Sequence, residues 1–337
     1  MNMNHSIIAA LLVCCFASNL LAKGPGPAVP IPMPGGGEGI GFDDLGYAPG
    51  LKKVLVAGGR TGNIFLVDPA TRKVSSVGGF TAEKDYKAGH GEGVTSADEG
   101  GGLLFGIDRN AGSVSAVDPK TGKIAASSKL SGSPDYVRYV ASMGELWVSE
   151  PDSEKIEVFT LSREKAAVSI VKAAEIAVPG GPESLVIDGS RDRAYTHTWK
   201  GESISIGLKS RAVVARWPNG CAGSRGIALD EKRGFLFVGC DEGKAVVLDA
   251  ARGGKVLSNL DAGKGVDVIA YSSRLARLYL PGAKSATMAI LGVSDAGTLT
   301  LISTVKTAER AHCAAADDRG GIWVCDPDHG RLLFFKE

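Results

Sequence analysis

Seven short apolar segments recur about every 45 residues along this chain, and each is preceded by one charged or ionisable residue. Carboxylate, guanidinium and imidazole groups can hold a cation, bind a charged ligand or move a proton. His90 lies two residues before the second of these positions and belongs with the set. The seven positions are Asp43, Glu92, Asp135, Glu183, Arg225, Asp267 and His312.

A repeat of this length with several short strands per copy is typical of a β-propeller. The second copy shows the layout, with strands expected at residues 94–97, 103–107, 114–117 and 124–130. The chain contains 46 glycines among 337 residues and has no long helical periodicity, which fits many strands joined by tight turns. We therefore predict an all-β fold, a seven-bladed propeller of four-stranded antiparallel blades.

The inner strand of each propeller blade starts beside the central axis. The seven ionisable residues before these strands, together with His90, are therefore expected to surround one mouth of the axial channel. Glu92, Asp135 and Glu183 could hold Ca²⁺ or Mg²⁺, because hard cations take oxygen ligands from several directions. With His90 or His312 as general base, such a site could hydrolyse a lactone or run a lyase reaction. The alternative is a water-filled channel whose carboxylates are neutralised by Arg225.

The last repeat ends at its third strand, near Arg331–Phe335, and lacks an outer strand. The proline-rich segment 28–34 can supply it, because proline is tolerated on an edge strand. Such pairing would close the ring and remove an open sheet edge. A flexible spacer is the alternative for this segment. The predicted domains are a signal peptide at 1–22, a linker at 23–27 and the propeller at 28–337.

The segment 7–17 is apolar but too short to span a membrane, and small residues follow it. This pattern predicts a signal peptide and a periplasmic or secreted protein; a lipoprotein modified at Cys14 is the alternative. No later apolar run is long enough to cross a bilayer.

Four cysteines remain after the predicted signal peptide, and an even number in an exported protein predicts disulfides. Cys313 and Cys325 are equidistant from the turn at 317–321 and should face each other across a hairpin. Cys221 and Cys240 flank the corresponding hairpin two blades earlier. We expect the bridges Cys313–Cys325 and Cys221–Cys240. A metal site made by the two cysteines of the last blade with His312 and His329 is the alternative.

Two motifs give the chain a family resemblance. The turn Asp-Pro-x-Thr-x-Lys occurs at 68–73 and at 118–123, and the opening segment runs Val-Pro-Ile-Pro-Met-Pro from Val29 and ends in Phe-Asp-Asp-Leu at 42–45. Together with apolar strands that follow a basic residue, these resemble the YVTN, or YncE-like, seven-bladed propellers of bacteria. No blade carries a literal Tyr-Val-Thr-Asn. The resemblance implies an exported propeller and no particular reaction.

Several function classes lack their sequence signals. The net charge is +1 with no basic block, which argues against dominant nucleic-acid binding. There is no Gly-x-Ser-x-Gly elbow, no Cys-x-x-Cys-His for haem and no phosphate-binding loop. We predict a monomeric exported binding or scaffold protein with a protein or small-molecule partner at the axial mouth. A metal-dependent, lactonase-like hydrolase or lyase is the alternative.

Overall fold

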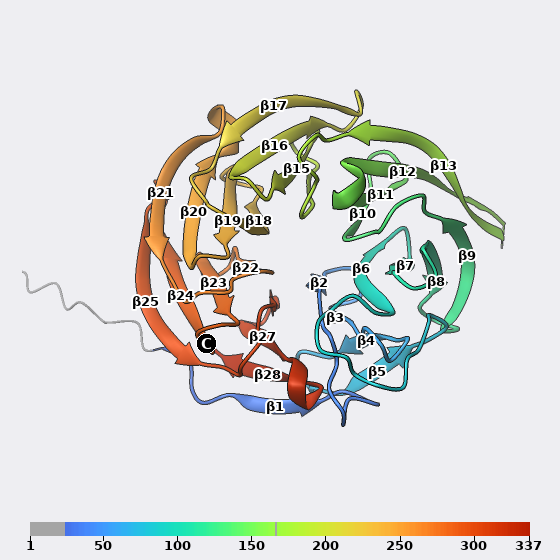
Figure 1. Cartoon of the computed structure of the whole chain (residues 1–337), viewed down its shortest axis with the longest axis horizontal. Helices are drawn as coiled ribbons and strands as arrows, with labels where there is room; N and C mark the ends of the chain where they lie inside the picture. Colours follow the sequence, from blue (N-terminus) through green and yellow to red (C-terminus); the bar gives the residue numbers. More distant parts are fainter. Residues whose placement is uncertain (1–23, 166) are drawn as a thin grey trace, which may run out of the picture.

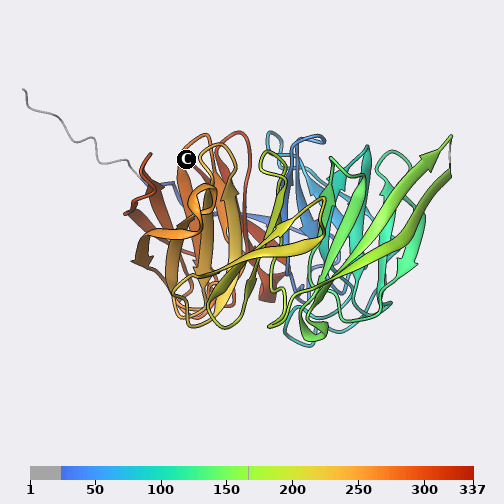
Figure 2. The same ribbon diagram turned by 90° about the horizontal axis from the view of Figure 1, so that it is seen from above.

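Seven four-stranded antiparallel sheets form a ring around a central channel in the computed structural model, which describes residues 24–165 and 167–337 (Figures 1 and 2). The fold predicted from the sequence is confirmed. From the axis outward, the first four blades are β2 (Leu45–Ala48), β3 (Lys53–Ala57), β4 (Ile64–Val67) and β5 (Val74–Val77); β6 (Val94–Gly100), β7 (Leu103–Asp108), β8 (Ser113–Asp118) and β9 (Lys123–Lys129); β10 (Val137–Val140), β11 (Glu145–Glu150), β12 (Lys155–Glu164) and β13 (Ala167–Ala177); and β14 (Val186–Asp188), β15 (Arg193–Thr198), β16 (Glu202–Gly207) and β17 (Ala212–Pro218).

The other three blades are β18 (Ser224–Asp230), β19 (Phe235–Cys240), β20 (Lys244–Asp249) and β21 (Lys255–Asp261); β22 (Ala270–Ser272), β23 (Arg277–Gly282), β24 (Thr287–Val293) and β25 (Leu299–Lys306); and β26 (Ala314–Ala316), β27 (Gly321–Asp326), β28 (Arg331–Lys336) and β1 (Val29–Pro32). Short 3₁₀ turns follow β11, β20 and β27 at Pro151–Ser153, Ala250–Arg252 and Pro327–His329.

The second strand of a blade is buried on both faces because neighbouring blades stack against it. Every residue of β7, β11, β19 and β27 is buried. These strands are rich in β-branched and aromatic residues, as expected for strands packed on both sides. In outer strands such as β9 and β21, by contrast, the side chains are exposed or partly buried.

The repeated Asp-Pro turn has a local cause. The Asp68 side chain accepts hydrogen bonds from the backbone N–H groups of Ala70 at 3.0 Å and Thr71 at 2.8 Å. Asp118 repeats the contact with the N–H of Lys120 at 2.8 Å. Aspartate stabilises such turns by replacing a backbone acceptor, so the motif is structural.

The ring is closed by the start of the propeller, as predicted. Strand β1 pairs with β28 in an antiparallel register that sets Val29 opposite Phe334 and Ile31 opposite Leu332, and it is the outermost strand of the last blade (Figure 1). The Ile31 side chain is buried against the core of that blade. The segment is therefore a strand, as predicted, and not the flexible spacer considered as the alternative. The predicted signal peptide at 1–22 lies outside the described residues.

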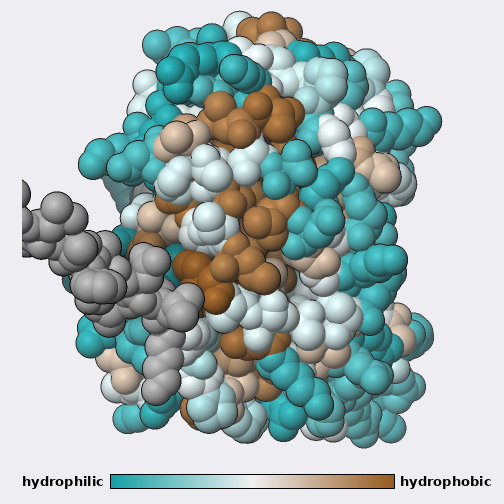
Figure 3. All heavy atoms as spheres, turned by 90° about the vertical axis from the view of Figure 1, so that its left-hand side faces the viewer, coloured by the Kyte–Doolittle hydropathy of each residue, from teal (hydrophilic) through white to brown (hydrophobic). Residues whose placement is uncertain are grey.

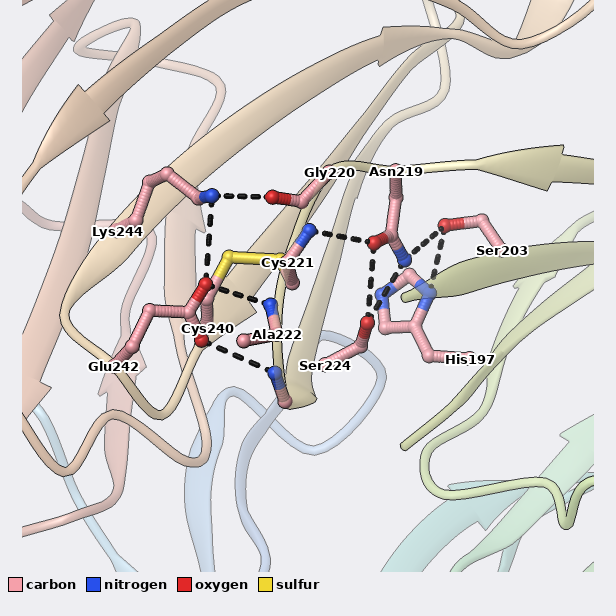
Figure 4. The surroundings of a disulfide bond; sticks show 11 residues. His197, Ser203, Asn219, Gly220, Cys221, Ala222, Ser224, Cys240, Glu242 and Lys244 are labelled. Atoms are coloured by element: carbon pink, nitrogen blue, oxygen red, sulfur yellow. Dashed lines mark hydrogen bonds and ion pairs between the residues drawn. A yellow bond between two sulfur atoms is a disulfide. The ribbon is translucent and has the colours of Figure 1, made fainter. Parts of the chain in front are cut away.

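Only one of the two expected disulfides is formed among the described residues. Cys221 and Cys240 are bonded, with their Cα atoms 5.4 Å apart (Figure 4). Cys313 and Cys325 are opposite each other, as the turn predicted, but both are free and buried. The N–H of Cys325 donates to the carbonyl of Cys313 at 3.0 Å, whereas the N–H of Cys313 donates to the Sγ atom of Cys325 at 3.1 Å. The sulfur of Cys325 thus accepts a backbone hydrogen bond and is not bonded to Cys313, so the prediction of a second bridge was wrong.

The outer edge of the fifth and sixth blades exposes some apolar side chains, which appear brown among polar ones in Figure 3. Val256 of β21 and Leu301 of β25 are 41 % and 54 % exposed. In the described part of the chain, no helix is long and apolar enough to cross a membrane.

Candidate functional site

A pocket of about 290 Å³ lies at one mouth of the axial channel. Residues just before the inner strands line it, whereas the inner strands and the residues after them line a second hollow, so the two mark opposite ends of the channel. Seven of the eight residues singled out from the sequence line the first pocket: Asp43, His90, Asp135, Glu183, Arg225, Asp267 and His312.

Glu92 is the predicted ring member that does not line the pocket. Its carboxylate forms an ion pair with Lys87 at 2.9 Å, and the Lys87 side chain is largely exposed. Glu92 precedes Gly93, which has a positive φ of 67°, and the inner strand β6 begins at the next residue, Val94. The position in the repeat was therefore a good guide to the place of the backbone but not to the direction of this side chain.

Arg109 connects two of the acidic residues. Its guanidinium is 2.6 Å from Asp135 and 3.5 Å from Asp43, and it also donates to the carbonyl of Pro134 at 2.8 Å. Burial and the nearby carboxylates of Asp43 and Glu183 raise the pKa of Asp135 well above its usual value, despite this contact. Arg109 thus compensates the crowded carboxylates only in part.

His90 lies beside the buried carboxylate of Asp43, with Nδ1 and Oδ2 3.2 Å apart. Burial alone would raise the pKa of Asp43, but His90 and Arg109 outweigh burial and lower it. The charge of Asp43 in turn raises the pKa of His90. Neither the Oδ2 atom of Asp43 nor the Nδ1 atom of His90 has a well-aligned hydrogen bond in the described structure, so this pair is incompletely satisfied.

Glu183 has two partners on neighbouring elements. Arg225 of β18 is 2.6 Å from its Oε1 atom, and the indole N–H of Trp199 donates to the other oxygen. The Arg225 guanidinium also lies over the Trp199 ring, 5.0 Å from its centre. Burial nevertheless raises the pKa of Glu183 to about 7, with a further contribution from Asp267, against the effects of Trp199 and Arg225.

Asp267 is different because its side chain makes no hydrogen bond or ion pair that involves the described residues. It faces the pocket, half-buried, with His90 and His312 close by. Burial raises the pKa of Asp267, and the charge of Asp43 adds to this effect, against the opposite effects of His312, His90 and Arg225. An unpaired carboxylate inside a polar pocket is a natural place for a ligand.

His312 has an acceptor at each ring nitrogen. Nδ1 is 2.7 Å from the carbonyl of Arg310, and Nε2 is 2.9 Å from the carbonyl of Phe42. Two carbonyl acceptors require two N–H donors, so this arrangement favours the imidazolium ion. His312 therefore adds a positive charge to the mouth and is poorly placed to act as a general base while both contacts are kept.

Ligand atoms of His90, Asp267 and His312 all lie within 4.8 Å of one another. By contrast, the three carboxylates expected to hold Ca²⁺ or Mg²⁺ each have a cationic partner. Glu92 has Lys87, Asp135 has Arg109 and Glu183 has Arg225. A divalent cation on that predicted set would have to compete with all three.

Sequence reasoning missed a second layer of the mouth, made by residues that follow the second strand of a blade. Arg109 comes directly after β7, Asp241 directly after β19, and Lys284 two residues after β23. Lys284 and Asp241 form an ion pair of 2.8 Å. Because the first two strands are antiparallel, the end of the second lies at the same mouth as the start of the first. Charged residues just after the second strand of a repeat were the available signal.

Comparisons with known proteins confirm the fold and go no further. No known family model matches the chain, and no curated protein matches its sequence. A chain of the structure titled "Crystal Structure of Mitotic Checkpoint Complex" has a TM-score of 0.75 and 16 % identity, with 99 % of each chain covered. Kuenenia stuttgartiensis hydrazine synthase has a TM-score of 0.71 at 14 % identity, covering 89 % of this chain and 96 % of the other. The Myceliophteria thermophila Cps50 (Swd1) β-propeller domain has a TM-score of 0.69 at 12 % identity, covering 89 % of this chain and 98 % of the other. At these identities the likeness establishes the β-propeller architecture alone.

Proposed function

We propose that this protein is an exported binding protein whose axial pocket accepts a positively charged organic group, an ammonium or a guanidinium. The observation that carries the proposal is the unpaired carboxylate of Asp267 inside the pocket. A cation that reaches Asp267 gains a charge-assisted hydrogen bond without breaking an existing ion pair.

The arginine and lysine side chains that line the mouth are already matched by carboxylates, whereas His312 is held by two backbone carbonyl groups. Arg225 faces Glu183 at 2.6 Å and Lys284 faces Asp241 at 2.8 Å, while Arg310 pairs with Asp328 on the last blade. An anionic ligand would have to draw one of these cations away from its carboxylate. A cationic ligand finds Asp267 free, with the buried Oδ2 atom of Asp43 also lacking a hydrogen bond in the described structure.

The size of the pocket limits the ligand. About 290 Å³ lies at the lower end of the volumes found for small-molecule sites, so the pocket suits a small amine or a single basic side chain of a partner. Propellers commonly serve as binding or scaffold proteins, and one structural neighbour is titled as a multiprotein complex.

Export is the second part of the proposal. The apolar leader at 7–17 and the Cys221–Cys240 disulfide support it, because disulfides persist in oxidising compartments. The repeat motifs support the proposal that the chain is a YVTN-like propeller of bacteria.

A metal-dependent hydrolase is the second candidate, and the closeness of His90, Asp267 and His312 favours it. In this alternative the free carboxylate of Asp267 would bind a divalent cation, and the cation would activate water or polarise an ester.

Calorimetric titration of the full chain separates these functions. The probes are n-butylammonium and methylguanidinium, with uncharged n-butanol as the matched control ligand and Ca²⁺ and Mg²⁺ in separate runs. D267N should weaken binding of the cations about 10- to 100-fold, the usual effect of losing a charged hydrogen bond. D261N, at an exposed position of β21, is the control variant and should bind normally.

Equal binding of n-butanol, or D267N that binds like wild type, would overturn the proposal. Binding of Ca²⁺ or Mg²⁺ that depends on Asp267, without binding of either organic cation, would overturn it in favour of the hydrolase.

A further inference from the structure

Two free cysteines lie directly behind His312. Cys313 follows it in the chain, and Cys325 of β27 is opposite Cys313. Both cysteines are fully buried. A nitrogen of His312 and the two Sγ atoms all lie within 4.8 Å of one another. This cluster shares His312 with the surroundings of Asp267, but its two sulfur atoms take no part in the proposed function.

The two sulfur atoms are close enough to share an ion. They lie within 4.8 Å of each other and are not bonded to each other. Two thiolates on one ion, each about 2.3 Å from it, stand about 3.8 Å apart in tetrahedral geometry. The limit of 4.8 Å on the separation of the two sulfur atoms is compatible with a shared ion.

The orientation of His312 fits a ligating imidazole. Its Nδ1 atom is 4.0 Å from the Sγ atom of Cys325. With metal–sulfur and metal–nitrogen bonds of about 2.3 and 2.05 Å, two ligands at a trigonal angle are about 3.8 Å apart. At the other side of the ring, Nε2–H donates to the carbonyl of Phe42 at 2.9 Å. That is the usual outer contact of a metal-bound histidine, and it leaves Nδ1 to the ion in place of its bond to Arg310.

We propose that His312, Cys313 and Cys325 form a binding site for a thiophilic d¹⁰ cation, Cu⁺ or Zn²⁺. Two thiolates and one imidazole are the ligands that such ions prefer. The backbone N–H of Cys313 points at the Sγ atom of Cys325 at 3.1 Å and would stabilise a thiolate there. Three ligands complete trigonal Cu⁺, and Zn²⁺ would add a water molecule.

His329, the fourth ligand considered from the sequence, does not belong to this site. Its Nδ1 atom bonds to Asp326 at 2.9 Å, and its side chain is 62 % exposed. The ion would enter from the axial pocket, because His312 lines the pocket and both cysteines are buried behind it.

The test uses the full chain, purified without oxygen, with the Cys221–Cys240 bridge verified by peptide mass mapping. Zn²⁺ and Cu⁺ are added separately and their affinities measured by competition with a chromophoric chelator; Co²⁺ provides a thiolate-to-metal charge-transfer band. We expect one ion per chain. C313S and C325S should each lower the affinity at least about 100-fold and abolish the Co²⁺ band, since even outer contacts of a metal ligand are worth 10- to 100-fold.

H312Q should weaken binding while keeping a weaker thiolate band, and H329Q is the matched histidine control that should change neither. The cysteine variants must keep the wild-type circular dichroism and the binding of n-butylammonium or, if the latter is absent in wild type, the wild-type melting curve. Three results would each overturn the proposal. They are a native disulfide between Cys313 and Cys325, the absence of stoichiometric metal binding in wild type, and metal binding that persists in C325S because the ion is held near Cys221 and Cys240.

Discussion

Replacing Glu183 by glutamine should remove a large pH dependence of stability. The pKa of Glu183 is raised to about 7 in the folded protein, chiefly by burial, from an ordinary value of 4.5. Between these values the folded state binds a proton that the unfolded state has released, so wild-type stability falls as the pH rises. A shift of about 2.5 units corresponds to about 3 kcal/mol in total, because one unit is about 1.4 kcal/mol.

The measurement is urea unfolding of wild type and E183Q at half-unit steps from pH 4 to pH 8. The difference between the two free energies of unfolding should change by about 3 kcal/mol over this range, with wild type relatively most stable at the acidic end. Glutamine keeps the shape of the side chain and an acceptor for Trp199 and Arg225, so the comparison isolates the proton.

Two further observations make the test specific. The indole N–H of Trp199 donates to Glu183, so its NMR signal should titrate near pH 7 in wild type and not in E183Q. E202Q removes a carboxylate that pairs with Arg216 at a more exposed position, and its effect should be small at every pH. A wild-type to E183Q difference that is constant with pH, or that changes only around pH 4.5, would refute the reasoning.

Three other changes have expected outcomes. Breaking the Cys221–Cys240 bridge, whose cysteines are 19 positions apart, should lower the free energy of unfolding by about 3 kcal/mol, measured by urea unfolding with and without reductant. I31D should destabilise the whole propeller in a single transition, because Ile31 is buried where β1 closes the ring; a separate early transition of the last blade would contradict this. R109M should leave Asp135 without its cation and Asp43 with His90 alone, so its loss of stability should be larger at pH 8 than at pH 5 in thermal melts.

The repeat predicted the architecture well because it is encoded locally. The position before each inner strand indicated which part of the backbone reaches the mouth of the channel. The proline-rich segment 28–34 indicated how the ring closes. What the repeat could not tell was how side chains from different blades pair. Arg109 meets Asp135 across 26 positions of sequence, and Glu92 turns to Lys87 instead of the axis.

The cysteines show the same limit at finer scale. Equal distances from a turn placed Cys313 opposite Cys325, but the sequence did not show that the N–H of Cys313 would donate to the Sγ atom of Cys325. Such a contact depends on the path of the backbone where the strand pair begins, which the spacing of two cysteines does not specify. The imidazolium character of His312 was equally hidden, because it comes from two carbonyl oxygens.

The seam between β1 and β28 has a mechanical consequence. Val29 is opposite Phe334, so the chain leading into β1 and the chain leaving β28 emerge from the same end of the pair. Tension between these two points would load the backbone hydrogen bonds one after another, as in opening a zipper, and not all together. Pro30 and Pro32 lack N–H groups, so few bonds resist. A modest pull on the two ends would thus detach β1 first and expose the edge of β28 to any strand able to pair with it.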